Sequence, residues 1–200
     1  MSNHSGEVLD FIAVDVEGNG QAHQEIIELA VVSSHQNTTL DISSWLIRAV
    51  APVTEQAMRF HGITNEDLEF SSTTEEIRSE VLKALGKGIV VGHNVSVDTR
   101  LIRKQFGEWG PLAIIDTVKL AKYVCPNLQS YSLDEMINEF ALDIVVSERH
   151  RAAGDARATA QLFNILLSKL KSTQRDVLTL SQIAGSADNP FLEDQQGDLF

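Results

Sequence analysis

The chain has little cysteine, little positive charge and no long apolar run. Its single cysteine, Cys125, excludes a disulfide within the chain and is typical of a reducing compartment. No apolar run approaches the roughly 20 residues that cross a bilayer, and Met1–Glu7 lacks the basic and apolar blocks of a secretory signal. These absences predict a cytoplasmic protein with no membrane partner.

The shortage of positive charge bears on the choice of partner. Sixteen Lys and Arg residues stand against 28 Asp and Glu residues, and the net charge is −12. Nucleic-acid-binding proteins usually derive affinity from basic residues, so this charge argues at first against such a partner. Carboxylates that hold divalent cations meet phosphate through the metal, however, and acidity then leaves a polyanionic substrate open. The charge predicts weak, local binding to nucleic acid.

Length and pattern predict one α/β domain over residues 1–172, followed by a flexible acidic tail over residues 173–200. With 43% apolar residues, the 200-residue chain can bury one core. Alternating and continuous apolar runs predict strands, the first three forming an antiparallel meander, and spacings of three and four predict helices. The expected strands are 11–14, 25–32, 45–47, 89–91 and 113–115, and the expected helices are 54–60, 73–85, 95–106, 133–140 and 152–170.

Four acidic residues stand where these elements begin or end. Asp15 and Glu17 are two residues apart at the end of a strand, so both side chains point to one face of the sheet. Asp98 and Asp155 each lie in the first turn of a helix, and helix N-termini favour anions. Ligands of α/β proteins gather at one end of the sheet, so the four carboxylates are expected to meet there. Such a cluster needs cations, and hard oxygen ligands favour two Mg²⁺ or Mn²⁺ ions.

Each of these residues also has an ordinary explanation. Asp98 and Asp155 could stabilise helix N-termini, and Asp15 with Glu17 could be a solvated strand end. His61 and His93 are expected to play local structural roles. The joint occurrence of the four acids, in order and each at an element boundary, favours a metal site.

Three motifs carry a resemblance to a known family. Asp15-Val-Glu17, His93-Asn-x-x-x-Asp98 and His150-x-x-x-x-Asp155 resemble the motifs of the DEDDh-type 3′–5′ exonucleases, which include the proofreading (epsilon) subunits of bacterial DNA polymerase III. The similarity extends from about residue 10 to about residue 170. It includes Phe60-His-Gly-Ile-Thr, Ile115-Asp-Thr and Ser132-Leu-Asp. The resemblance implies a ribonuclease-H-like fold with a mixed five-stranded sheet flanked by helices.

The resemblance also implies an activity and the residues for it. The enzyme would release nucleoside 5′-monophosphates from the 3′ end of DNA, in replication proofreading or repair. Asp15, Glu17 and Asp155 would hold the catalytic cation, and Asp15, helped by Asp98 through water, would serve a second. His150 would be the general base, for which an ordinary pKa near 6.5 is suitable.

The resemblance extends to the substrate contacts, with one departure. The family resemblance implies that Val16 and Gly18 face the terminal nucleotide, but the family usually has a hydroxyl-bearing residue at the position of Gly18. A glycine offers backbone and no side chain. Arg149 and Arg151 flank His150, and the sequence leaves open whether they contact phosphate or are only solvated.

The last residues form a second recognisable motif. The peptide Gln196-Gly-Asp-Leu-Phe200 resembles the short segment by which bacterial replication and repair proteins bind the sliding clamp, with Gly197 where leucine is usual. The expected contacts come from Gln196, Asp198, Leu199 and Phe200. Such a tether would raise the effective concentration of the enzyme at DNA, in a bacterial or phage-infected cell.

Two other functions remain open at this stage. The same residues would serve an RNA 3′–5′ exonuclease equally well, although the clamp-like peptide favours DNA. A non-catalytic adaptor could keep the fold and the tail, but it would have no need of the complete set of ligands. The expected partners are therefore a nucleic-acid 3′ end, with single-stranded DNA favoured, the sliding clamp, and a polymerase as a further candidate.

Overall fold

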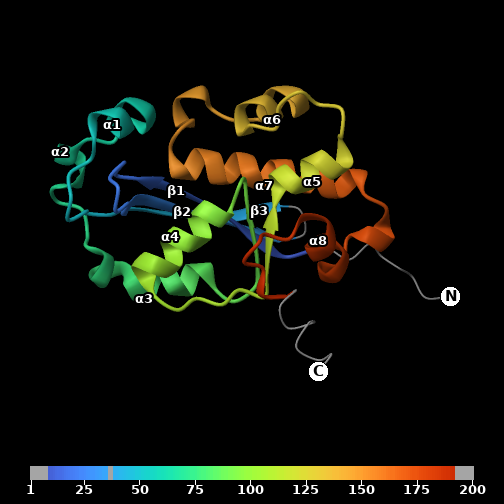
Figure 1. The fold of residues 1–200 in the computed structure, drawn as a ribbon, viewed down its shortest axis with the longest axis horizontal. Coiled ribbons are helices and arrows are strands. Elements are labelled where there is room, and N and C mark those ends of the chain that lie inside the picture. The colour runs from blue at the N-terminus through green and yellow to red at the C-terminus, as the bar shows by residue number, and fades with distance from the viewer. Residues whose placement is uncertain (1–8, 36–37, 192–200) are drawn as a thin grey trace.

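A computed structural model describes residues 9–35 and 38–191, and it contains a five-stranded mixed sheet flanked by helices (Figure 1). The strand order is β3-β2-β1-β4-β5. The pairs β1–β2 and β2–β3 are antiparallel, and β1–β4 and β4–β5 are parallel. The strands are β1 (Phe11–Gly18), β2 (Ile26–His35), β3 (Thr38–Leu46), β4 (Ile89–Gly92) and β5 (Ala113–Asp116). The arrangement confirms the expected fold class and the N-terminal meander.

The helices follow the expected order with additions. The α-helices are α1 (Glu55–His61), α2 (Asn65–Leu68), α3 (Thr74–Leu85), α4 (Ser96–Phe106), α5 (Thr117–Val124), α6 (Leu133–Phe140), α7 (Ala152–Lys169) and α8 (Val177–Ala184), and the short 3₁₀ helices are η1 (Val146–Glu148) and η2 (Ser172–Gln174). No helix in this described part of the chain is long and apolar enough to cross a membrane.

The central strand β1 has an apolar surface on both faces because alternate residues point to opposite sides. Phe11 and Ala13 pack in the core beneath α5, α6, α7 and α8, and Val14 packs in the core beneath α3 and α4. A third, smaller cluster lies under α1 and α2. Residues with odd numbers in β1 therefore face α7, and this alternation places Asp15 and Glu17 on the α7 side.

The two helices that carry Asp98 and Asp155 begin without the side-chain cap that other helices have. Thr54, Thr64, Thr73 and Ser132 each cap a helix with a side-chain oxygen, as their residue types favour. The helices α4 and α7, which carry Asp98 and Asp155, begin without such a cap. Their first turns must be held by other parts of the chain.

The expected domain boundary at residue 172 is wrong. Helix α8 buries Leu180 and Ala184 in the main core, and after it Gly185 bridges to Ile115 of β5. An eight-residue helix gains its stability from packing, which its own pattern does not reveal. The strand expected at 45–47 also begins earlier, at Thr38. Residues 192–200, including the clamp-like peptide, lie outside the described residues.

Candidate active site

Three of the four expected ligands converge. Asp15 and Glu17 project from the end of β1 toward α7, and Asp155 lies in the first turn of α7. One carboxylate oxygen from each lies within 4.8 Å of the other two. Within residues 9–35 and 38–191, this is the one group of His, Cys, Asp or Glu side chains that could hold a metal ion. The spacing of strand residues and the helix start are therefore enough to build a three-carboxylate cradle.

The fourth acid, Asp98, contacts the backbone of the same strand, β1. Asp98 is 9% exposed in the first turn of α4, and its Oδ1 accepts a hydrogen bond of 3.2 Å from the amide of Val16. Val16 stands between Asp15 and Glu17. Asp98 is thus held beside the cradle without being part of the group of three.

The fold keeps these carboxylates where their charged forms are disfavoured. Removal from water, followed by repulsion from Asp98, Glu17 and Glu28, holds the pKa of Asp15 well above its ordinary value. Burial and the charges of Glu28 and Asp98 raise the pKa of Glu17 to about 8. Burial raises the pKa of Asp98 to about 7. A divalent cation would relieve this repulsion, and an all-oxygen donor set suits Mg²⁺ or Mn²⁺.

Arg149 lies against the cradle instead of being solvated. Its guanidinium forms an ion pair with Asp155 and a second one of 2.6 Å with Asp134 of α6, and its side chain is 13% exposed. The two alternatives that the sequence left open, a phosphate contact and a solvated side chain, did not include this ion pair with Asp155. Arg149 is the positive charge nearest Asp155 in the described chain and links the cradle to α6.

A further carboxylate was missed by the sequence analysis. Glu28 of β2 is 3% exposed and pairs in register with Glu17 of β1. It accepts two hydrogen bonds from Arg151, with Nη2 at 2.7 Å and Nε at 3.1 Å, and a third of 2.8 Å from the amide of Ala152. Glu28 therefore holds the uncapped start of α7. The available signal was an acid in the middle of the buried run Ile26–Val32.

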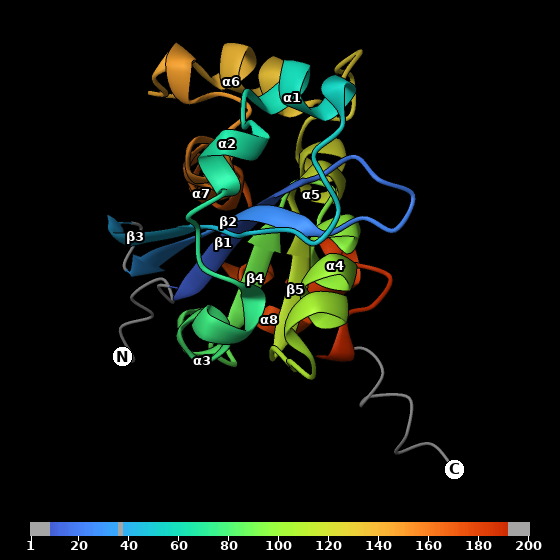
Figure 2. The ribbon, with the colours of Figure 1, turned by 90° about the vertical axis from the view of Figure 1, so that its left-hand side faces the viewer.

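His150 lies in the loop that leads into α7. Its φ of 59° is unusual for a residue other than glycine, and its ring packs on Phe60 of α1 with centroids 4.5 Å apart. Figures 1 and 2 show α1 on the same side of the sheet as the start of α7, into which this loop leads. His150 therefore lies outside the group of three carboxylates and in contact with α1.

A cavity of about 580 Å³ adjoins Glu17 on the α1 side. The expected substrate residues Val16 and Gly18 both line it, together with Gln24. A Cβ atom at residue 18 would collide with the side chain of Gln24, so the glutamine occupies the space that a side chain at this position would need. The full lining is Val16, Glu17, Gly18, Gly20, Gln24, Thr54, Gln56, Ala57, Arg59, Phe60 and His61.

The two remaining motif histidines have the local roles that were expected. His61 is buried, and its Nδ1 accepts a hydrogen bond of 3.1 Å from the amide of Ile63. Its Nε2 therefore carries the proton and donates to the carbonyl of Gly18 at 3.3 Å. Nδ1 of His93 lies 2.9 Å from the hydroxyl of Thr117, and its Nε2 lies 2.8 Å from the carbonyl oxygen of Tyr131, so the ring links these two residues. Burial lowers the pKa of both rings, which keeps them neutral.

Comparison with known proteins gives a consistent result. A family model described as "Exonuclease" (RNase_T) matches residues 12–163. The DNA polymerase III subunit epsilon of Aquifex aeolicus is 32% identical over 166 residues, which cover 80% of this chain and 81% of that protein. The DNA polymerase III PolC-type protein of Thermotoga petrophila is 33% identical over 190 residues, which cover 92% of this chain. The match spans 14% of that much longer relative.

Solved structures with the same fold include nucleases bound to DNA. Exonuclease X in complex with 5′ overhanging duplex DNA matches with a TM-score of 0.69 at 25% identity, and the match covers 84% of this chain and 99% of that one. Exonuclease I of E. coli in complex with a dT13 oligonucleotide matches with a TM-score of 0.68 at 16% identity, over 80% of this chain and 41% of that one. At that identity the second likeness concerns the fold alone.

Proposed function

The chain belongs to the exonuclease (RNase_T) family, and from this premise we propose that it is a divalent-cation-dependent 3′–5′ exodeoxyribonuclease of replication proofreading or repair. The product is a nucleoside 5′-monophosphate, released from a single-stranded 3′ end. The observation that carries the proposal is the convergence of Asp15, Glu17 and Asp155 within 4.8 Å. An adaptor would have no use for three crowded carboxylates that repel one another.

The proposed roles follow from the surroundings of each residue. Asp15, Glu17 and Asp155 hold the cation, with Asp98 beside them through its contact with Val16. A divalent cation held there would supply Lewis acidity at the phosphate and would favour ionisation of the attacking water. His150 accepts the proton of that water. In the described structure the imidazoles of His61 and His93 are engaged in hydrogen bonds, whereas the ring of His150 packs on Phe60.

The cavity beside Glu17 is the proposed site of the terminal nucleotide, and Gln24 supplies the polar side chain that Gly18 lacks. We expect Gln24→Ala to raise the KM for a single-stranded oligonucleotide about 3- to 10-fold, the value of one net hydrogen bond, while kcat stays near that of the wild type. Steady-state kinetics on a labelled oligonucleotide measures both constants. Gln21→Ala, in the same loop and outside the cavity lining, is the matched control. A fall in kcat without a change in KM would contradict this role.

Clamp binding by Gln196, Asp198, Leu199 and Phe200 remains a proposal that rests on the peptide sequence. We expect deletion of residues 195–200 to leave the rate on free oligonucleotides unchanged and to abolish binding to an immobilised bacterial sliding clamp. A polymerase is a further proposed partner, because the epsilon relative matches over most of its length. Loss of the basal rate on deletion would contradict the assignment of the tail to docking alone.

The proposed function is tested by digestion of matched DNA and RNA oligonucleotides, labelled at the 3′ or the 5′ end, with Mg²⁺ or Mn²⁺. Stepwise shortening from the 3′ end of DNA that EDTA abolishes is the expected result. Faster digestion of RNA would favour the RNA exonuclease instead. If neither cation supports cleavage, the non-catalytic adaptor would be the better interpretation.

A further inference from the structure

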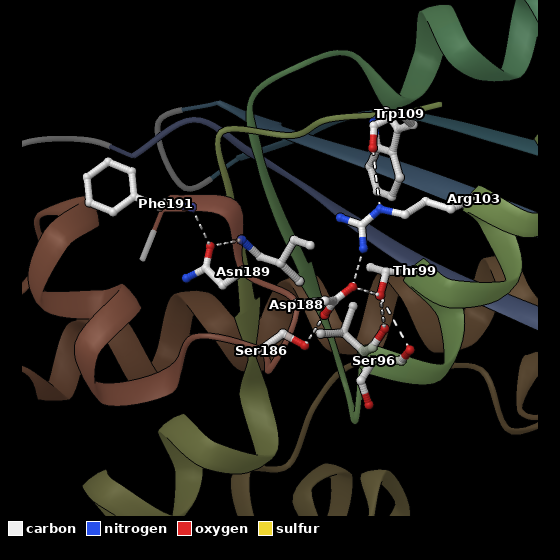
Figure 3. Close-up of polar contacts among 10 residues, drawn as sticks. Ser96, Thr99, Arg103, Trp109, Ser186, Asp188, Asn189 and Phe191 are labelled. Atoms are coloured by element: carbon white, nitrogen blue, oxygen red, sulfur yellow. Dashed lines mark hydrogen bonds and ion pairs between the residues drawn. The ribbon is translucent and has the colours of Figure 1, made fainter. Parts of the chain in front are cut away.

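The segment Ser186–Phe191, which follows the part of the chain matched by the family model, lies against β5 and α4 (Figure 3). Two hydrogen bonds join it to the backbone of β5. The amide of Ser186 donates to the carbonyl of Ile114 at 2.9 Å, and the amide of Ile114 donates to Oδ1 of Asn189 at 3.1 Å. Asn189 is 1% exposed. The segment therefore covers the outer edge of the sheet at β5.

Asp188, between these two residues, turns toward α4. Its Oδ2 accepts a hydrogen bond of 2.8 Å from the hydroxyl of Thr99 and forms an ion pair with Arg103, one turn further along the helix. Its Oδ1 accepts a hydrogen bond of 2.6 Å from Ser186. Figure 3 shows the carboxylate of Asp188 directed at both α4 side chains. One carboxylate thus joins the C-terminal segment to two successive turns of α4.

Asp188 carries its charge in this environment. Partial burial raises its pKa, but hydrogen bonds from Ser186 and Thr99 and the charge of Arg103 outweigh that effect and hold the pKa below its ordinary value. The bond from Thr99 is therefore charge-assisted, and Asp188 is the nearest of three acceptors within reach of this hydroxyl. Thr99 is fully buried, so without Asp188 its hydroxyl would donate to the carbonyl of Val95, 3.1 Å away at the start of the same helix, and the link to the C-terminal segment would be lost.

Thr99 is the residue that follows Asp98. No side chain caps the start of α4. The last turn of the helix is held by Gln105, whose side chain accepts a hydrogen bond of 2.7 Å from the amide of Ile26 of β2 and donates one of 3.0 Å to its carbonyl. Apolar contacts of Leu101, Ile102 and Phe106 with the sheet add to this. Gln105 lies about two turns beyond Asp98, so the first turn can shift slightly while the last turn stays in place. The Asp98 carboxylate, 3.2 Å from the Val16 amide, would move with it.

We propose that Asp188 is a positioning residue for the exonuclease reaction: through Thr99 and Arg103 it fixes the first turns of α4 and so the place of the Asp98 carboxylate beside the cation site. The inference rests on the proposed function of Asp98. It assigns a role in the active site to a segment outside the family match, 89 residues from Thr99 in the chain.

The test compares Asp188→Ala and Thr99→Val with Asn189→Ala, in the full-length protein at a temperature where all variants are folded. Asn189 belongs to the same segment and contacts β5. Its substitution therefore removes a hydrogen bond that holds the segment, without changing a contact with α4. Three quantities are measured for each: the Mn²⁺ dissociation constant by calorimetry, kcat at saturating Mn²⁺, and the KM for a single-stranded oligonucleotide. The double variant Asp188→Ala/Thr99→Val closes a thermodynamic cycle.

Asp188→Ala and Thr99→Val are each expected to weaken Mn²⁺ binding and to lower kcat about 3- to 10-fold, at the weak end of effects from residues that orient ligands. The KM should not change, and the double variant should lose no more than Asp188→Ala, which already removes the links to both Thr99 and Arg103. Asn189→Ala should lower the melting temperature and leave all three quantities unchanged. Equal effects of Asn189→Ala and Asp188→Ala, or additive losses in the double variant, would overturn the inference.

Asp98→Ala distinguishes a failure of the role of Asp188 from a failure of the proposed role of Asp98. If it loses Mn²⁺ affinity and activity while Asp188→Ala behaves as Asn189→Ala does, the role of Asp188 is wrong and the function stands. If Asp98→Ala keeps both, the proposed role of Asp98 is itself wrong and the inference falls with it.

Discussion

Asp15→Asn is expected to lower the exonuclease rate about 10³-fold and, in the same protein, to raise the melting temperature measured without metal. The rate falls because one donor of the three-carboxylate cradle is lost, and cation catalysis contributes several kcal/mol of transition-state stabilisation. The melting temperature rises because desolvation, followed by repulsion from Asp98, Glu17 and Glu28, raises the pKa of Asp15 and so makes its ionised form unfavourable in the folded protein, a cost that a neutral amide does not have. For a chain of this size, each 1 kcal/mol corresponds to about 2–4 °C.

Rate and stability thus move in opposite directions, which a merely disruptive substitution would not produce. Single-turnover digestion with Mg²⁺ gives the rate, and calorimetry in EDTA gives the melting temperature. Asp41→Asn makes the same chemical change at an exposed position on β3 and should alter neither quantity. A rate within tenfold of the wild type would remove Asp15 from the site, and a lower melting temperature would show that the carboxylates are not crowded.

Glu28→Ala is expected to lower the free energy of unfolding by about 3 kcal/mol and the exonuclease rate about 10- to 100-fold. Removing one partner of a buried ion pair typically costs 3–5 kcal/mol, and the partly exposed Arg151 keeps this case at the low end by turning its charge to water. The rate falls because Glu28 also accepts from the amide of Ala152, at the start of the helix that carries Asp155.

Urea denaturation and digestion kinetics measure the two effects. Glu75→Ala breaks another Glu–Arg pair, with Arg78 on α3, where the Glu75 side chain is 81% exposed; it should cost less than about 1 kcal/mol and leave the rate unchanged. Glu28→Gln keeps an acceptor for Ala152 and should lie between the wild type and Glu28→Ala. Normal activity in a destabilised Glu28→Ala protein would show that the contact is structural only.

Much of the site follows from local pattern. The period of two along a strand puts Asp15 and Glu17 on one face, and the apolar alternation of β1 identifies that face as the one covered by α7. From the motifs, Asp98, His150 and Asp155 are expected to join them, and Asp155 does so. Asp98 lies beside the cradle through its contact with Val16, and His150 lies outside the group of three. The five-stranded sheet could likewise be expected from the resemblance and from the count of apolar runs.

Other features could not be anticipated, because they depend on how distant segments are registered against each other. Glu28 matters because the β1–β2 register sets it opposite Glu17, and a shift of one residue would turn it to the other face. Gln24 fills the space over Gly18, and Arg149 lies between Asp155 and Asp134, through the conformation of loops. No periodicity in the sequence specifies either contact.

The sequence by itself determined the fold class, the exonuclease motifs and the pairing of Asp15 with Glu17, because helices, strands and helix starts are set by residues only a few positions apart. The tertiary structure alone decided that α8 belongs to the folded body, that Glu28 holds the start of α7, and that Asp188 reaches Thr99 across 89 residues. Such contacts follow from the register of strands and the packing of helices on the sheet, which arise only when the whole core is assembled.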